Sequence, residues 1–214
     1  MIKYYQLKTR AINIILSIFG KNVFTYVIYS PQRTFSNFFE QLLERNVFIN
    51  FEKGKKNINY YKHNPEPILD NKIKNKFIVF ILYKEFDVWY ESLKKNPMDF
   101  FGVVNEKFNK DIRSIKEKKK LKRYHKDFYL YWINKKKKIK NLEFVNFRDV
   151  LEKKDLTKFM KYLIDKYNVK TYLNFTLPKS VRFSSKFNKK KYSLSKKSRT
   201  KLDLIVNDLC NYKK

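Results

Sequence analysis

The segment FIVFILY at residues 77–83 is apolar at all seven positions, and it constrains the fold of this chain more than any other feature. Such an uninterrupted run, rich in β-branched and aromatic residues, is typical of a strand buried on both faces of a parallel sheet. The runs VFTYVIYS at 23–30 and LEFVNF at 142–147 have the same character, and VFINF at 47–51 is a shorter example. The sequence therefore predicts four buried strands.

Segments with helical periodicity follow these strands. Apolar residues recur at helical spacing after Asn37, and EFDVWYESLKKNP reads as a helix that ends near Pro97. Helices are also expected in the basic region 106–133, in 148–169 after a turn, and in 199–212. The helix within 148–169 has an apolar face made of Leu156, Phe159, Met160 and Leu163. This alternation predicts a three-layer α/β fold with a mostly parallel central sheet flanked by helices.

The chain length of 214 residues suits a single domain. A short helical extension is expected at about 1–22, with a helix at 11–19, and a basic loop at about 173–200. The single cysteine, Cys210, cannot form an intramolecular disulfide, which favours a reducing, intracellular compartment such as the cytoplasm. The apolar stretches are too short to predict a transmembrane helix, and no cleavage site suggests a signal peptide.

The charge of the chain is strongly positive. The sequence has 50 Lys and Arg residues and 20 Asp and Glu residues, which gives a formal net charge of +30 at pH 7. This field attracts nucleic acid, anionic glycans, anionic membranes or phosphorylated small molecules. The heavy use of Lys, Asn, Tyr, Phe and Ile with only three Gly also matches A/T-rich coding drift, so charge alone does not select a partner.

The stretch SPQRTFSN at 30–37 lies between a predicted strand and a predicted helix. In an open α/β sheet, such a loop offers backbone N–H groups and the positive end of a helix dipole to a phosphate. Arg33 can pair with phosphate oxygens, and short side-chain donors follow it at Thr34, Ser36 and Asn37. The alternative is an ordinary turn in which Ser36 or Asn37 caps the helix.

Two further stretches are expected at the same edge of the sheet. Lys84 follows the strongest strand, and Ser92 lies eight residues later on the next helix, so both can face one anion. The alternative is a solvated lysine and a surface serine. YYKHN at 60–64 contains His63, whose imidazole suits a general base. The other histidine, His125, lies in a basic helix and is expected to be a surface or structural residue.

Taken together, these stretches resemble the P-loop-related sulfotransferases over roughly residues 23–165. Members of this family move a sulfuryl group from 3′-phosphoadenosine 5′-phosphosulfate to an acceptor hydroxyl or amine. QRTFSNF is similar to the family's 5′-phosphosulfate loop, YKEFDVWYESLKKNP to its 3′-phosphate segment, and YYKHN to a Trp-Lys-His-Gly segment of some members. LEFVNFRDVLEK resembles the late strand and its acidic turn. The resemblance implies a P-loop nucleotide-hydrolase-like sulfotransferase fold.

The resemblance also implies the residues of a site. His63 is the base with Lys62 beside it, and Arg33 offsets charge on the transferring group. No metal is implied. The residues implied to bind the cofactor are Gln32, Arg33, Thr34, Phe35, Ser36, Asn37, Lys84 and Ser92.

Three residues depart from the family pattern: Phe35 replaces glycine, Lys84 replaces arginine and Phe86 replaces proline. A phenylalanine with positive φ would be strained by roughly 1 to 2 kcal/mol. Either the loop is reshaped around Phe35 and still binds phosphosulfate, or it has lost the ligand and kept the fold. Lys84 can still meet a phosphate as a point charge, without the bidentate fork of arginine.

Two rival functions remain open. One is a non-catalytic nucleic-acid or polyanion binder that uses the lysine runs at 116–123, 135–140 and 189–191. The other is a sulfotransferase fold without activity. The missing Walker pattern disfavours a kinase or ATPase. Under the sulfotransferase reading, the basic field suits an acidic acceptor such as a glycan.

Overall fold

The computed structural model describes residues 24–47, 49–51, 62–64, 67–95, 114–151, 153–171, 200–210 and 212. The helix expected at 11–19, with the rest of the N-terminal extension, lies outside these residues, and so does nearly all of the basic loop expected at about 173–200.

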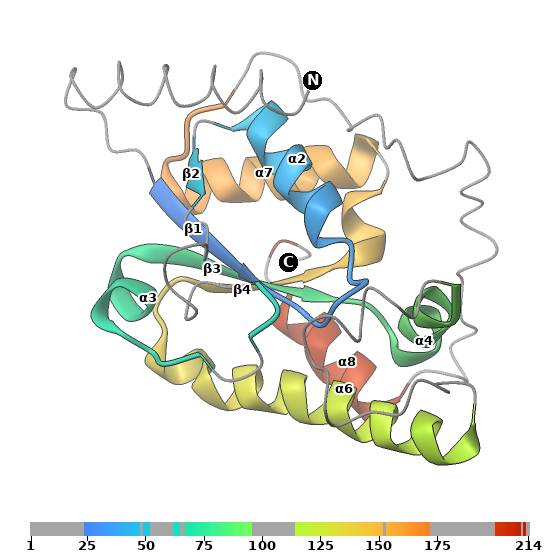
Figure 1. The fold of residues 1–214 in the computed structure, drawn as a ribbon. Helices are drawn as coiled ribbons and strands as arrows, with labels where there is room; N and C mark the ends of the chain where they lie inside the picture. Colours follow the sequence, from blue (N-terminus) through green and yellow to red (C-terminus); the bar gives the residue numbers. More distant parts are fainter. Residues whose placement is uncertain are drawn as a thin grey trace.

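One sheet with the strand order β2-β1-β3-β4 runs through the described part of the chain, and every neighbouring pair is parallel (Figure 1). The strands are β1 (Phe24–Tyr29), β2 (Ile49–Phe51), β3 (Phe77–Tyr83) and β4 (Leu142–Asn146). Each lies within one of the four predicted apolar runs. The pairing register places Val27 beside Val79, which in turn pairs with Leu142. The predicted parallel sheet is confirmed.

Helices cover both faces of this sheet. Their bounds are α2 (Ser36–Asn46), α3 (Asn71–Asn75), α4 (Phe86–Lys95), α6 (Ile115–Lys135), α7 (Lys153–Tyr167) and α8 (Lys201–Leu209), with short 3₁₀ helices η2 (Lys136–Lys138) and η3 (Phe147–Val150). Figure 1 shows α2 and α7 on one face and α6 and α8 on the other. The fold is therefore the predicted three-layer α/β arrangement. In the ranges described, no helix has both the length and the apolar character needed to cross a membrane.

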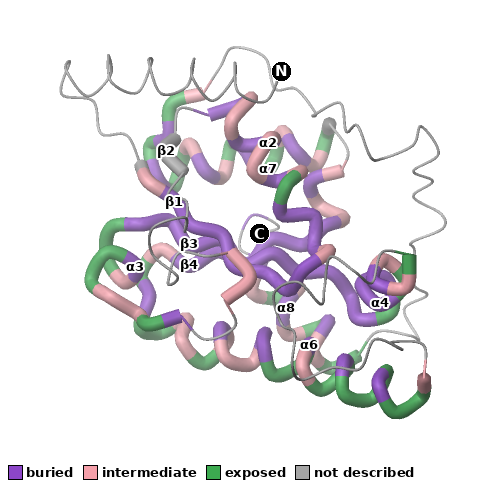
Figure 2. Tube along the Cα trace, viewed as in Figure 1, coloured by how far each residue is buried: buried purple, intermediate pink, exposed green. Residues whose placement is uncertain are grey.

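The core lies on both faces of the sheet because helices exclude water from each. All seven residues of β3 are buried, as the uninterrupted apolar run requires (Figure 2). On one face Phe80 contacts Phe39 of α2 and Phe159 of α7, with ring centroids 5.1 and 6.3 Å apart. On the other face Tyr83 packs against Tyr129 of α6 at 4.7 Å. The predicted apolar face of α7 is buried at all four positions, Leu156, Phe159, Met160 and Leu163.

The C-terminal helix α8 is fixed beneath the sheet by polar contacts. Thr200 and Asp203 form a capping box at its start. The buried Asp203 also accepts a hydrogen bond from the Tyr83 hydroxyl at the end of β3. Beyond the helix, the Tyr212 hydroxyl accepts a hydrogen bond from the backbone N–H of Asn146 at 2.9 Å. These contacts hold the last described residues against the carboxyl ends of β3 and β4.

The chain leaves β1 and β3 in opposite directions. β1 leads through α2 to β2 at one side of the sheet, whereas β3 leads through α4 and α6 to β4 at the other. Since β1 and β3 are neighbours, their carboxyl ends flank a topological switch point, the usual ligand site of an open α/β sheet.

Candidate functional site

The loop between β1 and α2 has an unusual backbone. φ is positive at Arg33 (63°) and at Phe35 (43°), and negative at Thr34 between them. A left-handed residue in a turn can bring successive backbone N–H groups to one side of the chain, as in anion-binding nests. A left-handed conformation costs a non-glycine residue about 1 to 2 kcal/mol. The loop thus holds two strained residues at the switch point.

Phe35 adopts the backbone conformation that glycine would provide. Its ring packs in the core, with its centroid 5.0 Å from the ring centroid of Phe147 and 6.1 Å from that of Phe39. Phe35 is only 8% exposed. Burial of a phenylalanine side chain is worth roughly 1.5 to 3 kcal/mol, which offsets the strain at this position. The ring is therefore part of the hydrophobic core.

The start of α2 is not capped as an ordinary turn would be. The N-cap residue is Phe35, and its side chain makes no hydrogen bond to the backbone N–H groups at the start of the helix. The alternative that Ser36 or Asn37 caps the helix is therefore wrong, because both residues lie inside its first turn. No acidic residue is present in that turn. An anion beside the loop would meet both the first N–H groups and the positive end of the helix dipole.

Lys84 and Ser92 come together as the sequence predicts. The Lys84 ammonium donates to Ser92 Oγ at 2.8 Å, and Ser92 in turn donates to the Val88 carbonyl at 3.0 Å. The same ammonium lies 3.5 Å from the carbonyl oxygen of Arg33 and 4.7 Å from the ring centroid of Phe147. The alternative of a solvated lysine is wrong, because Lys84 is 6% exposed.

The charge of Lys84 is poorly compensated. Burial, and then the neighbouring charge of Arg33, lower the pKa of Lys84 to about 8. Across the described ranges Lys84 makes no ion pair. Glu85 forms one instead with Arg148 of η3, with Oε1 3.0 Å from Nε. A buried ammonium that lacks a counter-ion is suited to receive one from a ligand.

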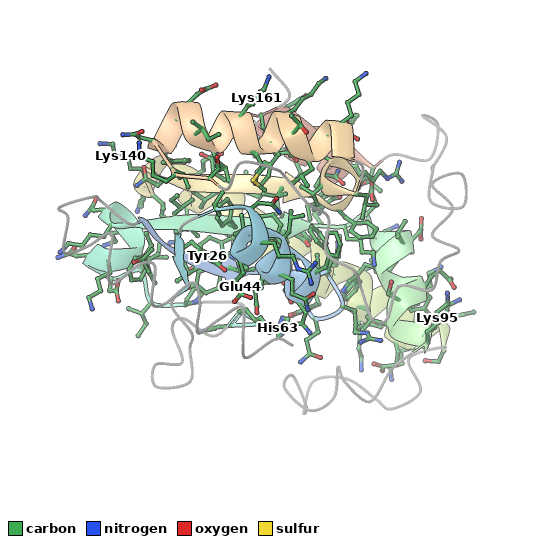
Figure 3. The ribbon with its side chains drawn as sticks, turned by 90° about the horizontal axis from the view of Figure 1, so that it is seen from above. Tyr26, Glu44, His63, Lys95, Lys140 and Lys161 are labelled. Carbon is green, nitrogen blue, oxygen red and sulfur yellow. The ribbon has the colours of Figure 1, made fainter. Side chains whose placement is uncertain are left out.

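Residues 62–64 lie against the end of β1. The Ser30 N–H donates to the Lys62 carbonyl, and His63 Nδ1 lies 2.9 Å from the Ser30 carbonyl oxygen. Lys62 pairs through its ammonium with Glu40 of α2 at 2.9 Å and also donates to Asn37. Figure 3 shows His63 beside α2, on the side of the molecule away from Lys161 of α7. The predicted base and the predicted loop thus share one edge of the sheet.

His63 is neutral at pH 7. Burial, assisted by the charge of Lys62, lowers the pKa of His63 to about 4. Because a carbonyl oxygen can only accept, Nδ1 carries the proton in the bond to Ser30, and Nε2 carries the lone pair. This tautomer can accept a proton. Lys62 holds the segment by its ion pair with Glu40.

Sequence reasoning missed three contacts. The Trp89 indole donates to the Gln32 carbonyl at 2.6 Å, His125 Nε2 bonds the Lys84 carbonyl at 2.9 Å, and Phe147 lies beneath the ammonium of Lys84. His125 is structural and buried, so its surface alternative is wrong. These contacts join residues that are 41 to 63 positions apart in the sequence, so no local pattern indicates them.

The arrangement offers two neighbouring places for negative charge. One is the loop with Arg33 and the start of α2; the other is Lys84 with Ser92. Three buried side-chain atoms of the loop have no hydrogen-bond partner among the described residues: Ser30 Oγ, Gln32 Oε1 and Thr34 Oγ1. Groups of this kind usually have a partner, and a ligand can supply it.

Comparisons of this chain with protein-family models, with curated proteins and with solved structures find no match.

Proposed function

We propose that this protein is a sulfotransferase on a P-loop-like fold, which moves a sulfuryl group from 3′-phosphoadenosine 5′-phosphosulfate to an acceptor hydroxyl or amine. The observation that carries the proposal is the pairing of two anion sites at one switch point. A loop with positive φ at Arg33 and Phe35 stands next to a buried Lys84 that contacts Ser92 and no carboxylate in the described ranges.

The donor nucleotide has two anionic ends, and the site has a place for each. The loop and the start of α2 would hold the 5′-phosphosulfate through backbone N–H groups and Arg33. Lys84 and Ser92 would hold the 3′-phosphate, which distinguishes this nucleotide from ATP. The unpartnered Ser30 hydroxyl can donate to the same ligand. The bound nucleotide would supply the sulfuryl group.

The residues around the loop suit the remaining chemistry. Transfer to a hydroxyl requires removal of its proton, and neutral His63 can accept that proton at Nε2. Arg33 and the loop N–H groups place positive charge where the leaving phosphate gains negative charge. Lys62 fixes His63 against α2 through Glu40 and is a positioning residue under this proposal.

The alternative function, a lysine-rich polyanion binder, has less support from geometry. The run at 116–123 lies on α6, which carries exposed Lys116, Lys119 and Lys122. However, α7 on the opposite face of the sheet also exposes lysines, Lys154, Lys158 and Lys161 among them. Basic residues cover both layers, as compositional drift predicts, and do not single out one surface. The run at 189–191 lies outside the described residues.

The alternative of an inactive sulfotransferase fold was based on Phe35. In the structure the ring of Phe35 is packed in the core against Phe39 and Phe147. Phe35 is therefore compatible with a ligand at the loop.

The proposal is tested by calorimetric titration with 3′-phosphoadenosine 5′-phosphate and with AMP, which lacks the 3′-phosphate. Wild-type protein should bind the bisphosphate about 10- to 100-fold more tightly, the range expected for charge-assisted hydrogen bonds to one phosphate. Lys84→Met should remove this preference. Lys126→Met, which removes an exposed lysine on α6, is the control and should preserve it. Equal affinity of the wild type for both nucleotides would exclude the proposed function.

A further inference from the structure

Trp89 connects α4 to the loop after β1. Its side chain is fully buried, and its Nε1–H donates to the carbonyl oxygen of Gln32 at 2.6 Å. The protein has only one other tryptophan, Trp132 of α6. That side chain is also fully buried, but its Nε1 has no hydrogen-bond partner in the described part of the chain. The two tryptophans are thus matched in size and burial and differ in this bond.

The bond acts on the loop through the planarity of the peptide. In a trans peptide the carbonyl and the following N–H point in opposite directions. When Trp89 holds the Gln32 carbonyl, the N–H of Arg33 is directed to the other side of the loop. Lys84 holds the next carbonyl, that of Arg33, at 3.5 Å and directs the N–H of Thr34 in the same way. Two consecutive N–H groups are thereby oriented by side chains from outside the loop.

Trp89 is itself held in place from α6. The ring of His125 lies 5.0 Å from that of Trp89, and His125 Nε2 bonds the Lys84 carbonyl at 2.9 Å. Since that carbonyl only accepts, Nε2 is the donor. Phe86 packs at 5.9 Å from Trp89 on the same helix. This packing fixes the indole relative to the ends of both central strands.

We propose that Trp89 is a positioning residue for the anion-binding loop: its indole N–H, by holding the Gln32 carbonyl, keeps the N–H groups of the strained loop aimed at the 5′-phosphosulfate. The inference rests on the proposed function for the identity of the ligand. The orientation of the loop by Trp89 can be measured without that ligand.

The first experiment compares Trp89→Phe with Trp132→Phe. Each variant loses one buried indole, so both should lose stability. The affinity for 3′-phosphoadenosine 5′-phosphate should fall about 10-fold in Trp89→Phe, because the Gln32 carbonyl loses its donor, and should change less than about 3-fold in Trp132→Phe. Equal affinities of the two variants would overturn the proposal.

A second experiment needs no change at Trp89. In Trp132→Phe protein, Trp89 is the only indole, and its N–H gives a single nitrogen-correlated NMR signal. That signal should shift when 3′-phosphoadenosine 5′-phosphate saturates the site. If Trp89→Phe does not fold, this NMR measurement tests the proposal in its place. An indole signal that does not shift when the nucleotide binds would overturn the proposal.

A third measurement separates this inference from the proposed function. If the wild type binds no nucleotide, the proposed function fails, and the backbone NMR order parameters of Arg33, Thr34 and Phe35 in the free protein then test the positioning role. These residues should be as ordered as the helices in Trp132→Phe and clearly less ordered in Trp89→Phe. Equal order parameters in the two variants would show that Trp89 does not order the loop.

Discussion

Replacing Lys84 by methionine should stabilise the free protein at neutral pH while removing its preference for a 3′-phosphate. Lys84 is 6% exposed, and burial is the largest cause that lowers its pKa from 10.5 to about 8. At 1.36 kcal/mol for each pKa unit, the charged form is disfavoured by about 3 kcal/mol in the folded state. Methionine gives up the hydrogen bond to Ser92 and the contact with Phe147, each worth roughly 1 kcal/mol. We therefore expect a net gain of about 1 to 2 kcal/mol in unfolding free energy.

The gain should depend on pH in a defined direction. The folded-state pKa of Lys84, about 8, lies below its unfolded value of 10.5. Between these values the unfolded chain binds more protons, so wild-type stability from this group rises as pH increases. The penalty of the buried charge is full below about pH 8 and absent above about 10.5. The advantage of Lys84→Met should shrink across that interval.

Urea unfolding at pH 7, 8.5 and 10 measures both effects, with Lys126→Met as the exposed-lysine control. Saturating 3′-phosphoadenosine 5′-phosphate should reverse the order at pH 7, since the wild type binds it about 10- to 100-fold more tightly than the variant and gains more stability from it. Suppose that Lys84→Met has a lower unfolding free energy than the wild type at pH 7, while Lys126→Met has the same one. The buried charge of Lys84 would then not destabilise the folded protein, and the reasoning would be refuted.

Position 35 should tolerate glycine better than alanine: Phe35→Gly should be about 1 kcal/mol more stable than Phe35→Ala, because both lose the ring but only alanine keeps the left-handed strain. Equal unfolding free energies would mean that the residue is unstrained. Acid should destabilise the protein between about pH 6.5 and 4, because burial lowers the pKa of His63 and of His125 to about 4 while their unfolded values are 6.5. An acid titration of His125→Asn should show a smaller loss, and an unchanged curve would contradict the assignment. His63→Ala should lower turnover of a supplied acceptor about 100-fold and leave nucleotide affinity within about 2-fold. Unchanged turnover would remove His63 as the base.

The sheet and its helices were predictable because their signals are local. FIVFILY has no charged residue and no apolar–polar alternation, so only a strand covered on both faces can bury it, and it forms β3 over the whole predicted range. The four α7 residues Leu156, Phe159, Met160 and Leu163 recur at helical spacing and are all buried. Lys84 and Ser92 are eight residues apart, and Ser92 lies on α4, the helix that follows Lys84 almost directly. The regular geometry of this helix brings Ser92 Oγ within hydrogen-bond distance of the Lys84 ammonium.

The details of the loop were not predictable because they depend on tertiary contacts. The preference of N-caps for serine and asparagine favoured Ser36 or Asn37, but the packing of Phe35 against Phe147 fixes Phe35 at that position. The bonds from Trp89 to Gln32 and from His125 to Lys84 each require helices that follow β3 to reach a strand end. Only the folded arrangement of α4 and α6 brings these groups within reach.

The most direct test of the central claim is a calorimetric titration of the wild-type protein with two isomers. Adenosine 3′,5′-bisphosphate and adenosine 2′,5′-bisphosphate carry the same charge and differ only in where one phosphate sits. A site built from Lys84 and Ser92 beside the Arg33 loop should bind the 3′ isomer at least about 10-fold more tightly. Equal affinities, falling together as salt is raised, would mean that the +30 charge alone attracts both isomers and that the switch point is not a site for this nucleotide.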